Sequence, residues 1–149
     1  MHISPNILVP GVSVLFFLAY AALWALGSLY SSYLSGWHLL ARRFSTCCEF
    51  LGEASRARPF FLDVCMRFWA DYSNWIRIAA TEKALHLSVT LPLRVGHSPL
   101  CIPWNEIEKR KAKFLWRRFL ALTLGEHERI PMRISERMAS ELGILERIQ

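Results

Sequence analysis

Charged side chains are missing from the first quarter of this sequence. No Asp, Glu, Lys or Arg precedes Arg42, so the 18 basic and 12 acidic residues of the 149-residue chain all lie in the remainder. A water-soluble domain distributes charge along its length, whereas a segment that meets lipid excludes it. The distribution indicates a lipid-facing segment followed by a water-facing part that carries the net charge of +6.

Motifs of catalytic and cofactor sites are also missing. The chain has no C-x-x-C pair, no G-x-x-x-x-G-K loop and no serine in a nucleophile-elbow context. His38, His86, His97 and His127 are far apart and lack metal-ligand spacing. The sequence therefore predicts a protein that is not an enzyme, with no catalytic residue, metal site or cofactor.

The four cysteines, Cys47, Cys48, Cys65 and Cys101, do not form a disulfide pattern. Two of them are adjacent, which suits few disulfide geometries. The other two stand among apolar residues, where cysteine acts as a small hydrophobic side chain. We predict that all four are unlinked thiols.

A long apolar run is the strongest positive feature. Residues 7–33 are uncharged and rich in Leu, Phe, Val and Ala, and about 20 such residues cross a bilayer as a helix. Tyr30, Tyr33 and Trp37 follow at the depth of an interfacial aromatic belt. A cleaved signal peptide needs a basic start and a shorter apolar core, and a buried core helix rarely runs so far without charge. We predict a transmembrane helix over residues 7–29, within an N-terminal segment of residues 1–34.

The flanking charges predict the orientation of this helix. Its N-terminal side has no Lys or Arg, while Arg42, Arg43, Arg56 and Arg58 follow on the other side. Positive residues stay on the cytoplasmic side. We therefore expect a single-pass protein of the inner (plasma) membrane, with the N-terminus outside and the C-terminal domain in the cytoplasm.

Residues 35–59 are predicted to be a juxtamembrane helix and a linker. Trp37, Leu40 and Phe44 recur at spacings of three and four, which favours one apolar helix face. Arg42 and Arg43 are then candidates to reach lipid phosphates. The alternative is the frayed end of the span with ordinary stop-transfer arginines.

Residues 60–149 are predicted to form a small α+β domain. Alternating apolar and polar residues with intervening turn signals indicate antiparallel strands, at residues 61–69, 75–80, 85–90, 100–102, 114–124 and 130–134. Ser135 is a good N-cap for a terminal helix, and Gly143 is a good stop signal. A curled sheet or open β-barrel with a C-terminal helix fits this order.

Two short motifs add a family resemblance. Residues 81–85 (TEKAL) match a hairpin turn of the form T-x-x-x-L, and residues 102–107 (IPWNEI) match I-P-hydrophobic-x-[DE]-I. This pattern resembles GRAM and bacterial pleckstrin-homology-like (PH-like) domains, over residues 61–145. Residues 77–89 are also similar to those of small uncharacterised bacterial membrane proteins with one N-terminal span. The resemblance implies a PH/GRAM-like fold that binds a partner or a membrane surface, and it implies no catalytic residues.

A basic run is the strongest local feature of the domain. Six cations with Phe and Trp among them occupy residues 109–118, and cations near an anionic bilayer contribute about 1 kcal/mol each. The alternatives are a solvated loop followed by a strand with a basic outer face, and nucleic-acid binding, which a membrane tether disfavours. The candidate contacts with a membrane surface or partner are Arg42, Arg43, Lys109, Arg110, Lys111, Lys113, Trp116, Arg117 and Arg118.

Together these features predict a membrane-anchored, non-enzymatic cytoplasmic binding module. Its expected contacts are the lipid bilayer and either an anionic lipid surface or a protein partner, and self-association is left open. The alternative function is a structural or assembly subunit of a membrane complex that acts through its transmembrane helix.

Overall fold

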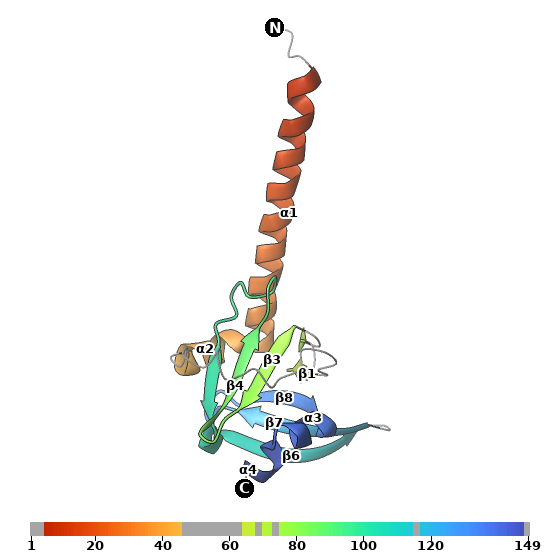
Figure 1. Cartoon of the computed structure of the whole chain (residues 1–149). Coiled ribbons are helices and arrows are strands. Elements are labelled where there is room, and N and C mark those ends of the chain that lie inside the picture. The colour runs from red at the N-terminus through yellow and green to blue at the C-terminus, as the bar shows by residue number, and fades with distance from the viewer. Residues whose placement is uncertain (1–4, 46–63, 68–69, 73–74, 115–116, 148–149) are drawn as a thin grey trace.

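The computed structural model describes residues 5–45, 64–67, 70–72, 75–114 and 117–147. One long helix, α1 (Pro5–Ser35), projects from a domain of two β-sheets, and its last turns rest on that domain (Figure 1). The helix is long because Pro10, in its second turn, is followed by no further proline within the helix, and the chain first leaves the helical conformation at Gly36. The helix therefore has two parts, one free of the domain and one attached to it.

Gly36 separates α1 from a second helix, α2 (Trp37–Phe44). Its φ of 79° lies in the left-handed region, and a Cβ at this position would come within 2.6 Å of Ile130 Cδ1. Glycine suits both requirements, because it has no Cβ. The chain can therefore change direction here against the domain surface.

Helix α2 buries the apolar face that its sequence predicts. Trp37, Leu40 and Phe44 are all buried, while Arg42 and Arg43 lie on the exposed side. The buried face packs into the core of the domain. The segment predicted to be a juxtamembrane helix is therefore a separate helix that packs into the domain core.

The strands form two antiparallel sheets. The three-stranded sheet has the order β3-β4-β5, with β3 at Ile76–Ala80, β4 at Ala84–Val89 and β5 at Leu100–Pro103. The five-stranded sheet has the order β2-β1-β8-β7-β6, with β1 at Val64–Met66, β2 at Ala70–Asp71, β6 at Ile107–Phe114, β7 at Arg117–Leu124 and β8 at Ile130–Ser135.

The core lies where the apolar faces of both sheets meet helix α2. The alternation predicted for β4 is confirmed, since Leu85, Leu87 and Val89 are buried and His86 and Ser88 are not. Period-two burial of this kind gives a strand one apolar and one polar face. The core cluster combines residues of all three layers: Trp37, Leu40, Ile78, Leu85, Leu87, Ile102, Leu122, Met132 and Ile134.

The C-terminal helix begins and ends as its sequence predicts. Ser135 Oγ accepts a hydrogen bond of 3.4 Å from the Met138 amide at the start of α3 (Glu136–Glu141). Gly143 follows with a φ of 63°. A second short helix, α4 (Ile144–Arg147), was not predicted, and it buries Ile144 in the core.

The predicted α+β class, N-terminal apolar helix and antiparallel strands are confirmed. The described strands form two sheets without a closed barrel, so the PH/GRAM-like barrel stays a prediction. One strand boundary is corrected: residues 107–113, outside the strand predicted at 114–124, belong to strand β6 after the short 3₁₀ helix η3 (Trp104–Glu106). The cations hid β6 because they conceal the apolar alternation by which strands are recognised.

Candidate functional site

The predicted site residues on α2 have different surroundings. Arg42 is exposed. The guanidinium of Arg43 lies 2.6 Å from Glu106 Oε1 and 3.5 Å from Glu128 Oε2, and it stacks over the Phe44 ring at 5.2 Å. Two carboxylates of the domain are therefore partners of Arg43, together with His127 Nδ1 at 3.2 Å, and Arg42 is the arginine of this pair that faces solvent.

The basic run lies on the hairpin of β6 and β7. Lys109 is half-buried, and its Nζ donates to the Leu145 carbonyl at 3.4 Å, which ties β6 to α4. Trp116 lies outside the described residues. The strand register pairs the remaining members with partners on β7: Arg110 with Ala121, Lys111 with Leu120, Lys113 with Arg118, and Phe114 with Arg117.

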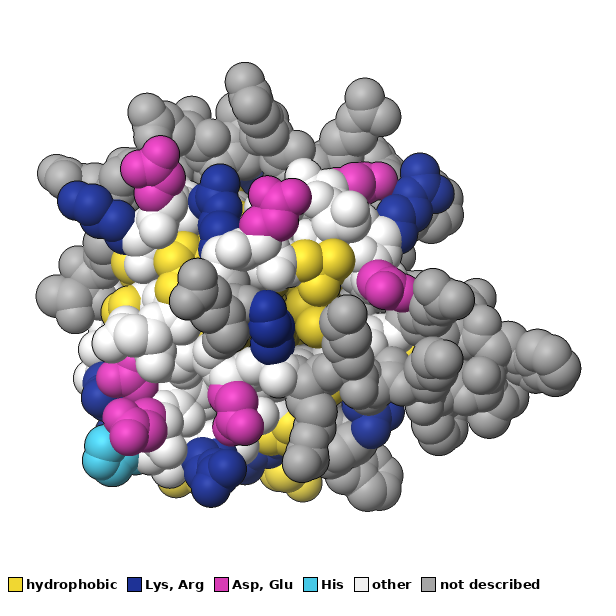
Figure 2. All heavy atoms as spheres, turned by 90° about the horizontal axis from the view of Figure 1, so that it is seen from below, with side chains coloured by type: hydrophobic (Ala, Val, Ile, Leu, Met, Phe, Trp, Pro, Cys, Tyr) yellow, Lys and Arg dark blue, Asp and Glu magenta, His cyan; other side chains and the backbone are white. Residues whose placement is uncertain are grey.

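This hairpin lies on the side of the domain away from α1 (Figure 1). Seen from that side, basic and acidic side chains are interspersed with small apolar patches (Figure 2). One open pocket there, of about 710 Å³, is lined by both signs of charge, including Glu106, Glu108, Glu126, Lys109 and Arg129. The described part of this face is thus of mixed charge.

The opposite end of the domain is built around three serines of α1. Ser28, Ser32 and Ser35 recur at spacings of four and three, so they share one helix face, and all three are buried. Ser28 Oγ lies 3.0 Å from the Leu93 carbonyl and 2.7 Å from the Val95 carbonyl. These contacts attach α1 to the loop between β4 and β5, which rises beside it in Figure 1.

Ser32 and a nearby glycine bring helix and loop closer still. Ser32 Oγ donates to the Gly96 carbonyl at 2.6 Å. Gly96 has a φ of 78°, and a Cβ there would come within 2.8 Å of Leu29 Cδ2 on the helix. The loop therefore approaches α1 as closely as a residue without a side chain permits.

A buried aromatic cluster lies under the end of α1. The Tyr72 hydroxyl is 2.8 Å from Ser35 Oγ and 2.7 Å from His97 Nε2, and Trp37 Nε1 donates to the Ser98 carbonyl at 2.8 Å. His97 Nδ1 lies 3.2 Å from the Val95 carbonyl, so both ring nitrogens of His97 have a hydrogen-bond partner. Burial lowers the pKa of His97 and raises the pKa of Tyr72, so both groups are held neutral.

The hydrogen bonding of this cluster is typical of a structural network. Within the described residues, no buried side-chain nitrogen or oxygen lacks a hydrogen-bond partner. A fully bonded network of neutral groups rigidifies its surroundings. The same described residues contain no group of three His, Cys, Asp or Glu that could hold a metal ion, and neither Cys65 nor Cys101 is in a disulfide.

Beside this junction lies a surface that we call the proximal face, made of Trp75, Arg77, Leu91, Arg94 and Val95. All five are exposed, with 73% of Leu91 and 40% of Trp75 accessible. Large apolar side chains rarely stay exposed together unless they meet a partner or lipid. Sequence reasoning missed this face because the loop appeared only as an interruption between strands. The serine spacing in α1 was the available signal.

Comparison of the chain with family models, with curated proteins and with solved structures found no match. The GRAM and PH-like resemblance therefore stays a prediction. One described helix, over Val12–Ser35, is long and apolar enough to cross a membrane, and only 6% of its most apolar stretch is buried in the structure.

Proposed function

We propose that this chain is a membrane-anchored, non-enzymatic binding module whose PH-like domain rests on the cytoplasmic surface of the bilayer and engages its anionic lipids. Helix α1 is the anchor in this proposal. A helix over residues 7–29 is about 34 Å long, close to the ~30 Å of a bilayer's hydrocarbon core. Arg42 and Arg43 follow it at the side where positive residues are retained.

The all-round apolarity of α1 supports a lipid environment. Leu15, Phe17 and Leu23 point in different directions around the helix, and each is more than 60% exposed. A helix that is apolar on every side is stable only in a core or in lipid, and the domain covers little of it. Removal of the helix as a signal peptide would also remove Ser28 and Ser32, to which the domain's own loop is bonded.

The observation that carries the proposal is that these serines hold the proximal face beside the exposed tyrosines at the end of α1. Ser28 and Ser32 flank Tyr30, and Tyr33 follows one residue later; both tyrosines are exposed at the end of the span. Exposed tyrosines mark the level of the lipid head groups. The hydrogen bonds from the serines bring Leu91 to Val95 to that level, so apolar side chains of the loop meet acyl chains and its arginine meets head groups.

Quenching of Trp75 by brominated lipid tests this placement. The full chain is reconstituted in nanodiscs of phosphatidylcholine with brominated or ordinary acyl chains. The Trp75 emission is taken as the difference between the wild type and Trp75→Phe. We expect bromine to quench it. Trp104 is the matched control, because its Nε1 donates to the Thr81 carbonyl at the opposite end of the three-stranded sheet. The Trp104 emission, taken in the same way as the difference between the wild type and Trp104→Phe, should not be quenched.

Equal emission from Trp75 in both nanodiscs would overturn the proposal. The cytoplasmic orientation has its own test, since thiol reagents that cannot cross the membrane should miss Cys47 and Cys48 in intact cells. Ready labelling of these cysteines from outside the cell would indicate the opposite orientation. Crosslinked neighbours lost only when α1 is altered, and kept when the basic run is changed to serine, would favour an assembly subunit.

A further inference from the structure

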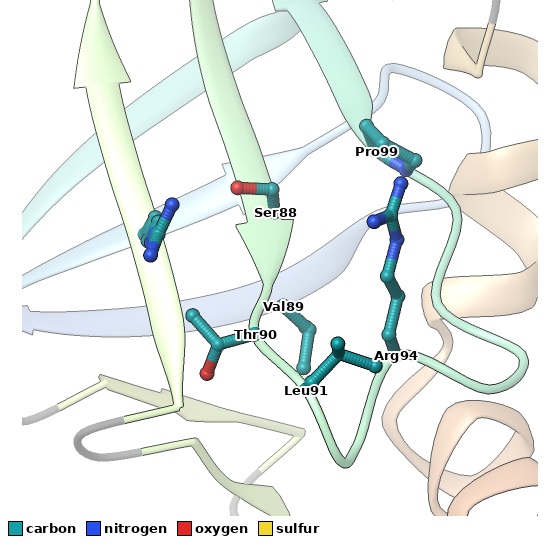
Figure 3. A pocket seen from close by; sticks show the side chains of 7 residues that line it. Ser88, Val89, Thr90, Leu91, Arg94 and Pro99 are labelled. Atoms are coloured by element: carbon teal, nitrogen blue, oxygen red, sulfur yellow. The ribbon is translucent and has the colours of Figure 1, made fainter. Parts of the chain in front are cut away.

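An open pocket of about 310 Å³ lies within the proximal face. Its lining combines two cations, two hydroxyls and apolar side chains (Figure 3): Arg77, Ser88, Val89, Thr90, Leu91, Arg94 and Pro99. Arg77 stands on β3 directly opposite Ser88 on β4, and Arg94 reaches up from the loop toward Pro99. Two strands and one loop therefore contribute to a single concave site.

The two arginines differ from Arg43 in what surrounds them. Arg43 is bound by Glu106 and Glu128. Among the described residues, no carboxylate pairs with Arg77 or Arg94, and both side chains are exposed. Two guanidinium groups that line one pocket without a carboxylate partner are stabilised by an anion bound there, and phosphate oxygens match their geometry.

The hydroxyl groups complete the site. Ser88 is half-buried at the pocket wall and can donate to an anion. Thr90 Oγ1 donates to the Trp75 carbonyl at 3.1 Å, so its lone pairs stay available as acceptors and Trp75 is held beside the pocket. The pocket thus offers donors for a phosphate and an acceptor for a hydroxyl attached to it.

The position of the pocket beside α1 favours a lipid phosphate over a phosphate in solution. Arg94 lies between Leu93 and Val95, whose carbonyls accept from Ser28 of α1, and exposed Leu91 lines the rim. At that depth the rim meets acyl chains while the guanidinium groups meet head groups. Phosphate on a bilayer lipid also has a far higher effective concentration there than phosphate in solution.

We propose that Arg77 and Arg94 bind the phosphate of an anionic phospholipid with a hydroxylated head group, phosphatidylglycerol being the simplest example. Phosphatidylcholine fits less well, because its own quaternary ammonium neutralises the phosphate and would meet two cations. This inference rests on the proposed function, since it needs the proximal face at the bilayer.

The test uses the full chain in phosphatidylcholine nanodiscs that contain a minor share of one brominated lipid, either phosphatidylcholine or phosphatidylglycerol at the same mole fraction. Quenching of Trp75 reports which lipid lies beside the pocket. We expect brominated phosphatidylglycerol to be enriched about fivefold over brominated phosphatidylcholine, the scale of one cation at an anionic surface. The double variant Arg77→Gln, Arg94→Gln should abolish the enrichment and keep the quenching by brominated phosphatidylcholine.

The charge-matched control is Arg137→Gln, Arg147→Gln, which removes two exposed cations from α3 and α4. This control should retain the enrichment. If it also lost the enrichment, the preference would be due to overall charge, and the proposal that the pocket binds an anionic lipid would be wrong. Equal quenching by both lipids in the wild type would also contradict lipid binding in the pocket, whereas no quenching by either lipid would contradict the proposed function.

Competition distinguishes lipid from soluble phosphate. Millimolar inorganic phosphate, compared with chloride at the same ionic strength, should leave the enrichment unchanged. Complete displacement by inorganic phosphate would assign the pocket to a soluble anion and overturn the lipid proposal. The melting temperature of each variant, measured in the same nanodiscs, identifies any loss of enrichment that is due to unfolding, and single Arg→Lys variants that fold should then recover part of the preference.

Discussion

Helices α1 and α2 are neighbours in sequence and contain the same kinds of apolar residues, yet they face different surroundings. In α1 the apolar residues cover every side of the helix, and most of them are exposed. In α2 they cover one side, and Trp37, Leu40 and Phe44 are buried in the domain core. The distribution of apolar residues around a helix, more than their number, decides whether it packs on protein or stands in lipid.

Gly36 and the three serines connect these two environments. Gly36 turns the chain, and Ser28, Ser32 and Ser35 give the last turns of α1 a polar side that bonds to the domain. The orientation of the domain relative to α1 is therefore set by a few short contacts.

The largest effect is expected for Leu40→Ala. Leu40 is fully buried, and truncation of such a leucine costs about 2–5 kcal/mol through lost contacts and the cavity left behind. Leu39→Ala, next to it on the exposed side, and Leu23→Ala on α1 should leave the domain's unfolding free energy nearly unchanged. Chemical denaturation of the full chain in nanodiscs measures this. A similar cost at all three leucines would contradict the distinction between the helices.

A smaller loss is expected for Gly36→Ala. The left-handed backbone disfavours a side chain by about 1–2 kcal/mol, and the new Cβ would displace Ile130, so we expect a loss of about 1–3 kcal/mol. Gly27→Ala is the control, because no atom lies within 4 Å of its added Cβ and alanine favours a helix. If Gly36→Ala were as stable as Gly27→Ala in thermal unfolding, the turn would not require glycine.

The third prediction concerns pH. Burial lowers the pKa of His97 in the folded chain. As the pH falls below about 6.5, the unfolded chain therefore binds a proton at this histidine more readily than the folded chain does. The His97 contribution to stability is complete above pH ~6.5 and declines as the pH falls toward the lowered folded pKa. His97→Gln should reduce this acid sensitivity in unfolding curves. His86, whose pKa burial also lowers, contributes a remaining slope.

The smallest effect is expected on the polar side of α2. Arg43→Gln removes partly exposed ion pairs with Glu106 and Glu128, and such pairs contribute about 0–1 kcal/mol. Added salt should shrink the difference from the wild type. Arg42→Gln, one position earlier and exposed, should have no measurable effect on thermal unfolding. A loss at Arg42 as large as at Arg43 would mean that the ion pairs are not the cause.

Sequence reasoning predicted the features that depend on local pattern. The apolar run, the buried face of α2, the alternation of β4, the N-cap at Ser135 and the stop at Gly143 all follow from spacing or from backbone preference. The candidate site was predicted less well. The basic run was visible, yet its cations concealed strand β6, and the strand pairing carries it to the side away from α1.

The proximal face was not predictable in the same way. Serine in an apolar helix bonds either to its own backbone or to another segment, and the spacing of Ser28 and Ser32 does not say which. Tyr72 and His97 are 25 residues apart and meet only through the packing of the two sheets on α1. Contacts of this range depend on how whole elements pack.

The sequence by itself determined that this protein has a charge-free helix, an amphipathic helix after it and an α+β domain of antiparallel strands, because hydrophobic periodicity and capping act over a few residues. Only the tertiary structure decided which surface of the domain lies beside that helix. Serine hydroxyls and loop carbonyls pair there across more than 60 residues of sequence, and they bring Arg77 and Arg94, rather than the basic run, to the end of the apolar helix.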